Sequence, residues 1–340
     1  MKYHQIQNGE KNMKLCMIGA FGHSNYVFEG LKEHPDINLS AISAGDGSQP
    51  ERLKNMVGQN NYDPQIYTDW REMLDREKPD VLSVDGPFHL HAEMSLEALK
   101  RGIAVFCEKP VAFTSEELSA LESASAENGN KFCAMTGLRY LPNFYQAFRM
   151  FENGDIGEPV LIQTRKSYKM ATRPDYYRQR STYGGTIGWV GSHAVDWILW
   201  FSRSSFAQVS AFQSRRFNGG YGTLESAAQC LCTMKNGVLG EISMDFLRPE
   251  QAPTWGDDRV RIVGSQGVLE AAQGELTLTD KNGENKIEVE QPDRTLFGDF
   301  IRSLKGTGST LASAADVFEM TRACIAMQQA ADEERVVKLD

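Results

Sequence analysis

The residues best placed to do chemistry follow a short apolar run, Ile103–Cys107. The run is typical of a strand buried on both faces, and Pro110 ends it because proline cannot continue a central strand. Lys109 is therefore predicted at the carboxyl end of a strand, the edge where open α/β sheets bind ligands. A lysine fixed there can donate to a substrate hydroxyl or exchange a proton with it. For an isolated Glu108-Lys109-Pro110, a solvated loop lysine would be the better interpretation.

A second candidate is His193. From Ser192 to Phe201 the apolar spacing is helical, which puts His193 on the first turn of a predicted helix. The helix dipole there disfavours the protonated imidazole, and a near-neutral histidine suits general acid–base work at pH 7. The alternative is a packing histidine, which is the more common role of a single buried histidine.

A glycine-containing turn follows the first predicted strand, residues 14–18, and precedes a predicted helix. This is the context of a dinucleotide-binding loop. Gly19 would permit the tight turn, and Gly22 would let backbone N–H groups approach a pyrophosphate at the helix N-terminus. Phe21 and Ser24 take the places of the second and third glycines of G-x-G-x-x-G. A plain strand–helix turn stays an equal alternative.

Two further positions bear on ligands. Asp46 follows the second predicted strand, 37–43, close to where a ribose-binding acid is expected, but about two places late. NAD and NADP therefore both stay open. His89 and His91 lie beside the predicted nicotinamide site without a nearby carboxylate or cysteine partner, so we expect loop packing and no metal site.

The surrounding elements divide the chain in two. Strands and helices alternate through about residue 140, which predicts a doubly wound parallel sheet. A capping box at Thr114–Glu117 opens one of its helices. The pattern changes after about residue 154. From Phe206 onward strands dominate, and Asn236-Gly237 is a strong hairpin turn. The second half therefore predicts a mostly antiparallel sheet, with closing helices at 295–304 and 314–331.

Composition narrows the class of protein. The chain has 340 residues, enough for about two domains, and its net charge of -9 disfavours nucleic acid and anionic membranes as partners. No apolar run is long enough for a membrane span, and the polar N-terminus lacks a signal-peptide core. The six cysteines are scattered. We expect reduced thiols and a cytoplasmic protein.

Several segments together resemble the Gfo/Idh/MocA oxidoreductases in order and spacing. They are Cys107–Pro110, Gly137–Pro142, Gly157–Pro159 and Gly184–Asp196, with Pro253–Arg259 and Gly264–Glu270 resembling some members. The resemblance implies an N-terminal α/β Rossmann domain, residues 14–140, and an α+β domain with a large open, mostly antiparallel sheet, residues 141–340. It also implies NAD or NADP, a sugar, cyclitol or related polyol as substrate, and a homo-oligomer, dimer or tetramer, formed through the open sheet.

The resemblance also assigns roles to residues. Lys109 and His193 would be catalytic. The cofactor would contact Gly19, Phe21, Gly22, His23, Asp46, Gly86, Pro87, His91 and Glu108. The substrate would face Lys109, Arg139, Tyr140, Tyr176, Tyr177 and His193. Many family members carry an aspartate four residues before the histidine, and here that residue is Trp189.

These observations favour a dehydrogenase in which Lys109 is the main proton acceptor and His193 its helper. An NAD-dependent glycosidase that oxidises its substrate transiently is one alternative, because some relatives work in this way. A non-catalytic nucleotide-binding sensor is another, and Trp189 keeps it open. Retention of both Lys109 and His193 argues against the sensor.

Overall fold

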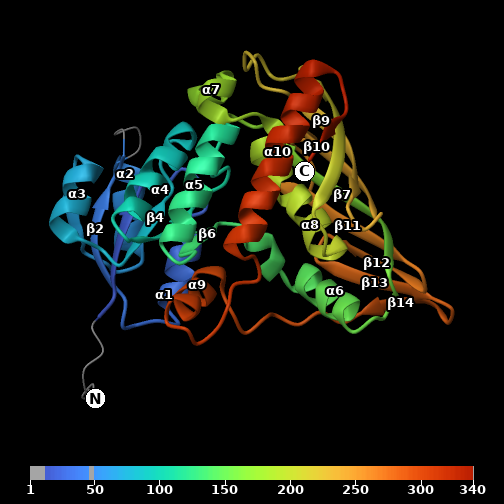
Figure 1. Ribbon diagram of the computed structural model, residues 1–340, viewed down its shortest axis with the longest axis horizontal. Coiled ribbons are helices and arrows are strands. Elements are labelled where there is room, and N and C mark those ends of the chain that lie inside the picture. Colours follow the sequence, from blue (N-terminus) through green and yellow to red (C-terminus); the bar gives the residue numbers. More distant parts are fainter. Residues whose placement is uncertain (1–11, 46–49, 340) are drawn as a thin grey trace.

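Two sheets organise the computed structural model, which describes residues 12–45 and 50–339 (Figure 1). The predicted ribose-binding residue Asp46 lies outside the described residues. Strand and helix alternate in the first half, and strands dominate the second. Among the described residues, no helix is both long and apolar enough to cross a lipid bilayer.

The first sheet is parallel, with strand order β3-β2-β1-β4-β5-β6. Its strands are β1 (Lys14–Ile18), β2 (Asn38–Ser43), β3 (Gln65–Tyr67), β4 (Val81–Val84), β5 (Ala104–Cys107) and β6 (Phe132–Ala134). The direction of winding reverses between β1 and β4, and ligands of such sheets bind at the carboxyl ends of the strands there. The predicted doubly wound fold is confirmed.

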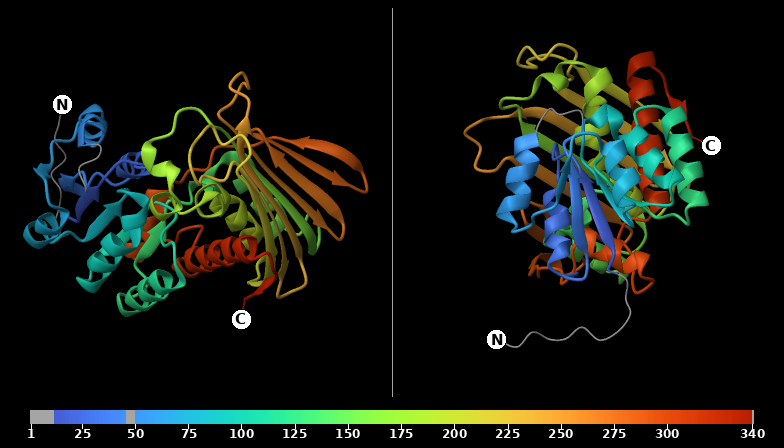
Figure 2. Two further views of the ribbon diagram at one scale, coloured as in Figure 1. Left: turned by 90° about the horizontal axis from the view of Figure 1, so that it is seen from above. Right: turned by 90° about the vertical axis from the view of Figure 1, so that its left-hand side faces the viewer.

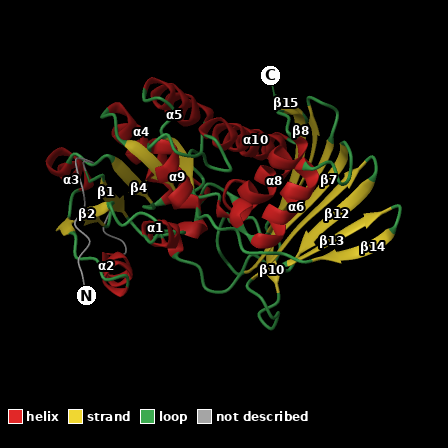
Figure 3. Ribbon diagram, turned by 90° about the horizontal axis from the view of Figure 1, so that it is seen from below, coloured by secondary structure: helices red, strands yellow, loops and turns green. Residues whose placement is uncertain are grey.

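Helices cover both faces of this sheet (Figure 3). On one face lie α3 (Trp70–Glu77), α4 (His91–Lys100) and α5 (Ser115–Glu127). On the other lie α1 (Asn25–Leu31), α2 (Pro50–Gln59) and α9 (Leu296–Leu304). Thr114 and Glu117 form the predicted capping box of α5, each side chain bonding the other residue's backbone N–H. Although α9 follows the second sheet in sequence, it packs against α1.

The second sheet has the order β14-β13-β12-β11-β7-β10-β9-β8-β15, and only the β7–β10 pair in it is parallel. Its strands are β7 (Pro159–Lys169), β8 (Phe206–Ser214), β9 (Ala227–Met234), β10 (Leu239–Arg248), β11 (Gly256–Gly264), β12 (Gly267–Ala272), β13 (Glu275–Asp280), β14 (Gly283–Ile287) and β15 (Val337–Lys338). The predicted large, mostly antiparallel sheet is confirmed.

Helices cover one face of the second sheet, and Figure 2 shows the other face bare. The covering helices are α6 (Pro142–Glu152), α8 (Ser192–Ser202) and α10 (Ala314–Glu333). A short helix, α7 (Arg180–Tyr183), and a π-helical turn, η4 (Ile187–Gly191), precede α8. Because η4 runs directly into α8, His193 does not lie at a free helix end. The predicted effect of a helix dipole on His193 is therefore wrong.

Candidate active site

Lys109 lies at the carboxyl end of β5, as predicted, and is fully buried. Its Nζ donates to the backbone oxygen of Trp189 at 2.8 Å and lies 4.1 Å from the centre of that residue's ring. The Glu108 carboxylate is 3.9 Å from Nζ. Burial lowers the pKa of Lys109 to about 8, although the negative charge of Glu108 opposes this change. At neutral pH the amine is therefore poised to exchange a proton.

His193 projects from the first turn of α8 and is also buried. Among the described residues its Nδ1 has no hydrogen-bond partner. Its pKa is well below the usual value, first because of burial and then because Lys109 and Lys166 are positive neighbours. The imidazole is therefore neutral at physiological pH, for a different reason than the sequence indicated. Its ring stands edge-on to His23, with 6.2 Å between the ring centres.

The glycine turn between β1 and α1 is bonded to the ends of β4 and β5. The carboxylate of Asp85 accepts from the Gly22 N–H at 2.6 Å and from the Ser24 N–H at 3.0 Å. Its backbone oxygen accepts from the Phe21 N–H at 3.0 Å. Burial, and then the charge of Glu108, raise the pKa of Asp85 to about 7 despite these hydrogen bonds. Asp85 is not among the residues predicted from sequence, although an acid directly after a buried strand marks this edge of the sheet.

Glu108 connects the glycine turn to Lys109. Its Oε2 accepts from the His23 N–H at 3.2 Å and lies 2.9 Å from His23 Nδ1. Burial alone would raise the pKa of this carboxyl, but His23 and Lys109 together lower it. A Cβ atom at Gly22 would lie 2.7 Å from the Glu108 side chain, and one at Gly19 would lie 2.3 Å from the Asp85 backbone oxygen. Both glycines are thus required by packing against these two acids.

Of the predicted nicotinamide-side residues, His91 has a structural role. It is fully buried, with Nδ1 2.9 Å from the Pro110 oxygen and Nε2 3.1 Å from the Gly86 oxygen. It therefore joins the loops after β4 and β5, and its predicted contact with the cofactor stays a prediction. Gly86 and Pro87 lie in the loop after β4, where their cofactor contacts stay predictions.

Arg139 and Tyr140 also form hydrogen bonds with other elements of the fold. Arg139 is buried and donates twice to Asp196 on α8, at 2.9 and 2.6 Å. The Tyr140 hydroxyl donates to Asp299 on α9 at 2.9 Å and accepts from the Leu311 N–H. Both side chains are engaged in these structural bonds, and their predicted contact with substrate stays a prediction. Partners 57 and 159 positions away cannot be read from sequence.

Tyr176 and Tyr177 belong to an aromatic cluster at the carboxyl ends of β4 and β5. The Tyr176 ring lies 5.5 Å from Phe21 and 5.3 Å from Phe88, and it is half-buried. Tyr177 is buried, with its ring 5.6 Å from that of Trp189. The cluster therefore connects Phe21 of the glycine turn with Trp189, whose ring covers Lys109. Whether either tyrosine contacts substrate stays a prediction.

A charged pair that is absent from the sequence predictions lies on the covered face of the second sheet. Lys166 on β7 is almost fully buried and donates to Oδ2 of Asp258, its register partner on β11. Oδ1 of Asp258 has no partner within the described part of the chain. The alternation of β7 places Lys166 between the inward residues Thr164 and Tyr168. The sequence shows this alternation, but it does not show which face of the strand the helices cover.

Comparisons with known proteins decide the family. A model described as "Oxidoreductase family, NAD-binding Rossmann fold" matches residues 13–136, and one described as "GFO/IDH/MocA C-terminal domain" matches residues 144–270. The chain belongs to the Gfo/Idh/MocA family. The predicted resemblance is confirmed, and the protein is an NAD(P)-dependent oxidoreductase.

Individual relatives agree with this family. A solved oxidoreductase structure from Thermotoga maritima is 39% identical, with a TM-score of 0.92 over 96% of this chain and 100% of that one. An uncharacterized oxidoreductase of Bacillus subtilis is 25% identical over 83% of this chain and 80% of its own length. The inositol 2-dehydrogenase/D-chiro-inositol 3-dehydrogenase of Lactiplantibacillus plantarum is 22% identical over 88% and 84%, respectively.

Proposed function

We propose that this enzyme oxidises a hydroxyl of a sugar, cyclitol or related polyol, or reduces the corresponding ketone, with Lys109 and His193 in proton transfer. The observation that carries the proposal is the buried Lys109 at the end of β5, whose pKa is lowered to about 8. A relative named for inositol oxidation supports the substrate class. Bound nicotinamide would accept or supply the hydride.

The chain's own residues divide the remaining work. Lys109, in its neutral form, accepts the proton of the substrate hydroxyl. The Trp189 backbone oxygen and the Glu108 carboxylate orient its Nζ. Neutral His193 offers its unpartnered Nδ1 to the same substrate. A positioned proton acceptor of this kind contributes about 10²–10⁴-fold to the rate.

The glycine turn offers backbone N–H groups, which are suitable donors for a dinucleotide phosphate. It connects the end of β1 to the N-terminus of α1, the place where such phosphates bind. In this structure four of these N–H groups, from residues 21 to 24, donate to Asp85 or Glu108. Gly19, Phe21, Gly22 and His23 would hold the pyrophosphate once these acceptors give way. Glu108 would then lie beside the nicotinamide ribose.

The test is a panel of polyols and sugars assayed with NAD and with NADP, read by absorbance of the reduced nicotinamide. The wild type should reduce one cofactor with at least one polyol. Lys109→Ala should lower turnover by at least about 100-fold, while NADH still binds with its wild-type affinity. Near-normal turnover of the variant would remove the lysine from the mechanism. Glycoside cleavage without net NADH would instead favour the glycosidase.

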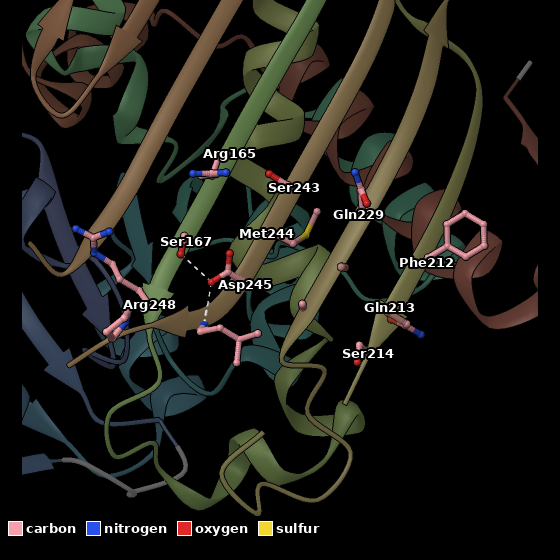
Figure 4. Close-up of a pocket in the computed structure, with 14 residues that line it drawn as sticks. Arg165, Ser167, Phe212, Gln213, Ser214, Gln229, Ser243, Met244, Asp245 and Arg248 are labelled. Atoms are coloured by element: carbon pink, nitrogen blue, oxygen red, sulfur yellow. Dashed lines mark hydrogen bonds between the residues drawn. The ribbon is translucent and has the colours of Figure 1, made fainter. Parts of the chain in front are cut away.

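We also propose that the enzyme is a homo-oligomer associated through the bare face of the second sheet. Figure 4 shows side chains of Arg165, Gln229 and Phe212 projecting from this face, along a groove that crosses β7, β10, β9 and β8. Phe212 is 71% exposed and Leu231 is 54% exposed, which is costly for an uncovered surface. Phe212→Asp should lower the mass measured by light scattering. Phe217→Asp, in the exposed loop after β8, is the matched control.

A further inference from the structure

Lys109, the proton acceptor of the proposed function, is fully buried. The groups whose charges act on it are Glu108, Lys166, Asp85 and Cys324, and each of these is buried as well. Oxidation of a hydroxyl to a ketone passes a hydride to bound NAD and one proton to Lys109. A route through the protein would let that proton reach water while substrate and cofactor still fill the site.

Glu108 connects Lys109 to a side chain that reaches the surface. Its Oε1 lies 3.9 Å from Lys109 Nζ, and its Oε2 lies 2.9 Å from Nδ1 of His23. Oε1 has no hydrogen-bond partner within residues 12–45 and 50–339, so its lone pairs are available to Lys109. The side chain of His23 is 31% exposed. Lys109, Glu108 and His23 therefore form a continuous series from the buried amine to solvent.

The other groups that act on Lys109 offer no such route. Lys166 is the donor in its bond to Asp258, and an ammonium group has no lone pair with which to accept a proton. The partners of Asp85 in the glycine turn are backbone N–H groups and a serine hydroxyl, which take up no extra proton near neutral pH. The thiol of Cys324 stays protonated, because burial raises its pKa to about 12.

His23 lies between the proposed proton-transfer residues and solvent. Its ring stacks on Tyr26 of α1, with 5.6 Å between the ring centres, and stands edge-on to His193 of α8. Glu108 and Asp85 are the carboxylates whose charges interact with it. With Nδ1 beside Glu108, Nε2 has no partner in the described part of the chain and is not buried. The imidazole therefore has one nitrogen for Glu108 and one for water.

We propose that Glu108 and His23 form a proton relay that carries the proton of the substrate hydroxyl from Lys109 to solvent. The inference rests on the proposed function, and His23 acts on Lys109 through Glu108. Protonated Lys109 gives a proton to Oε1 of Glu108, and the carboxyl group turns and gives it to Nδ1 of His23. The imidazolium then releases a proton to water from Nε2, as histidine shuttles do. A half-turn of the ring presents an unprotonated nitrogen to Glu108 again, and no electrons move in these steps.

The separation of 3.9 Å between Nζ and Oε1 suits a transfer that follows protonation. One N–H of Lys109 donates to the Trp189 oxygen at 2.8 Å. The ammonium form has three donors and a full charge, so it is drawn toward the Glu108 carboxylate. A phosphate at the His23 N–H would replace the 3.2 Å contact of Oε2 with that group, and the shorter contact with Nδ1 would remain.

The first experiment follows the proton and the hydride separately in a single turnover of polyol oxidation. Absorbance records NADH, and a pH-indicator dye in weak buffer records the released proton. The wild type should release the proton as fast as NADH forms. In His23→Asn the amide nitrogen can replace Nδ1 as a donor to Glu108, but it cannot take up a proton. Proton release in this variant should lag behind NADH formation by at least about tenfold.

A small base in solution separates a relay from a structural role. In His23→Ala, added imidazole can occupy the place beside Glu108 and should restore fast proton release. The control is His89→Ala, which removes an exposed histidine from the loop after β4. Its proton release should keep pace with NADH formation, with or without imidazole.

Exchange of the Lys109 Nζ protons with solvent tests the relay without substrate or cofactor. NMR of protein that contains isotope-labelled lysine measures this exchange below pH 8, where Lys109 is an ammonium group. The exchange should be at least about tenfold slower in His23→Asn than in the wild type. Lys166 is the internal control, because it is equally buried and pairs with Asp258 instead of Glu108. Its exchange should be the same in both proteins.

The outcomes separate the relay from the proposed function. Slowed Nζ exchange in His23→Asn, with no NADH formed by the wild type from any polyol, would overturn the proposed oxidation and support the relay. NADH formation with proton release and Nζ exchange as fast in His23→Asn as in the wild type would overturn the relay alone. A lag that imidazole does not remove, with unchanged Nζ exchange, would show that His23 is structural and would also overturn the relay.

Discussion

The glycine turn and the proposed substrate side of the candidate site differ in whether their polar groups have hydrogen-bond partners. In the glycine turn the N–H groups of residues 21–24 all donate to Asp85 or Glu108. On the substrate side, buried polar atoms lack partners within the described chain: Glu108 Oε1, Asn143 Nδ2, His193 Nδ1 and Asp258 Oδ1. Because unpartnered buried atoms are costly, a ligand that bonds them would stabilise the proposed substrate side, whereas the N–H groups of the glycine turn already have acceptors in the protein.

Glu108 takes part in both ends, since one of its oxygens binds the turn and the other faces Lys109. Its partners His23 and Lys109 come from different strand ends. A phosphate that replaced Glu108 at the His23 N–H would free its carboxylate to move relative to Lys109. Binding at one end is thereby connected to the charge around the proton acceptor at the other.

The largest effect is expected where a buried polar residue is structural. Arg139→Met should destabilise the protein by about 3–5 kcal/mol, because it leaves Asp196 charged and buried without a partner. Urea unfolding measures this change. The double variant Arg139→Met with Asp196→Leu should recover most of the loss. A raised KM with unchanged stability in the single variant would instead return Arg139 to the substrate site.

A smaller effect, on the pH dependence of the reaction, tests whether Lys109 is the proton acceptor. With a pKa of about 8, below its usual 10.5, Lys109 becomes a neutral base as the pH rises through 8. The value of kcat/KM for polyol oxidation should therefore rise about tenfold per pH unit up to pH 8 and then level off. Residual activity of Lys109→Ala should lack this rise. A flat wild-type profile would show that another group accepts the proton.

The sequence predicted the features that depend on local pattern. The apolar run that ends at Pro110 predicted the buried strand β5 and the edge position of Lys109. The spacing Thr114-x-x-Glu117 predicted the start of α5 to the residue. Each of these features is specified by a few neighbouring residues, so a single sequence contains enough to identify it.

Features that depend on distant partners were not predictable. Lys166 and Asp258 meet because β7 and β11 pair in one antiparallel register, 92 positions apart in sequence. The bond between Arg139 and Asp196 could not be predicted either, because Asp196 lies on a helix whose packing the pattern does not define. For His193, the neutral state was predicted correctly but from the wrong cause. Burial and neighbouring lysines replace the helix dipole, because η4 extends the helix.

The last prediction concerns the glycine turn itself. Asp85 has a pKa of about 7, raised from 3.8 by burial and by Glu108, so it gains its charge as the pH rises through 7. The ionised carboxylate holds the Gly22 and Ser24 N–H groups and repels a pyrophosphate. The affinity for NADH should therefore fall above pH 7, by up to about tenfold per pH unit. Fluorescence titration at pH 6 and pH 8 measures the change.

Asp85→Asn provides the control, because it removes the titrating group and keeps the size of the side chain. Its NADH affinity should be nearly independent of pH and, at pH 8, about tenfold higher than that of the wild type. The other ionisable groups that face Asp85 are His23, Cys107, Glu108, Lys109 and Tyr176. If the variant keeps the wild-type pH dependence, one of these groups controls cofactor binding. The difference between the glycine turn, whose N–H groups have acceptors, and the proposed substrate side, whose polar atoms lack partners in the described chain, would then need an explanation without Asp85.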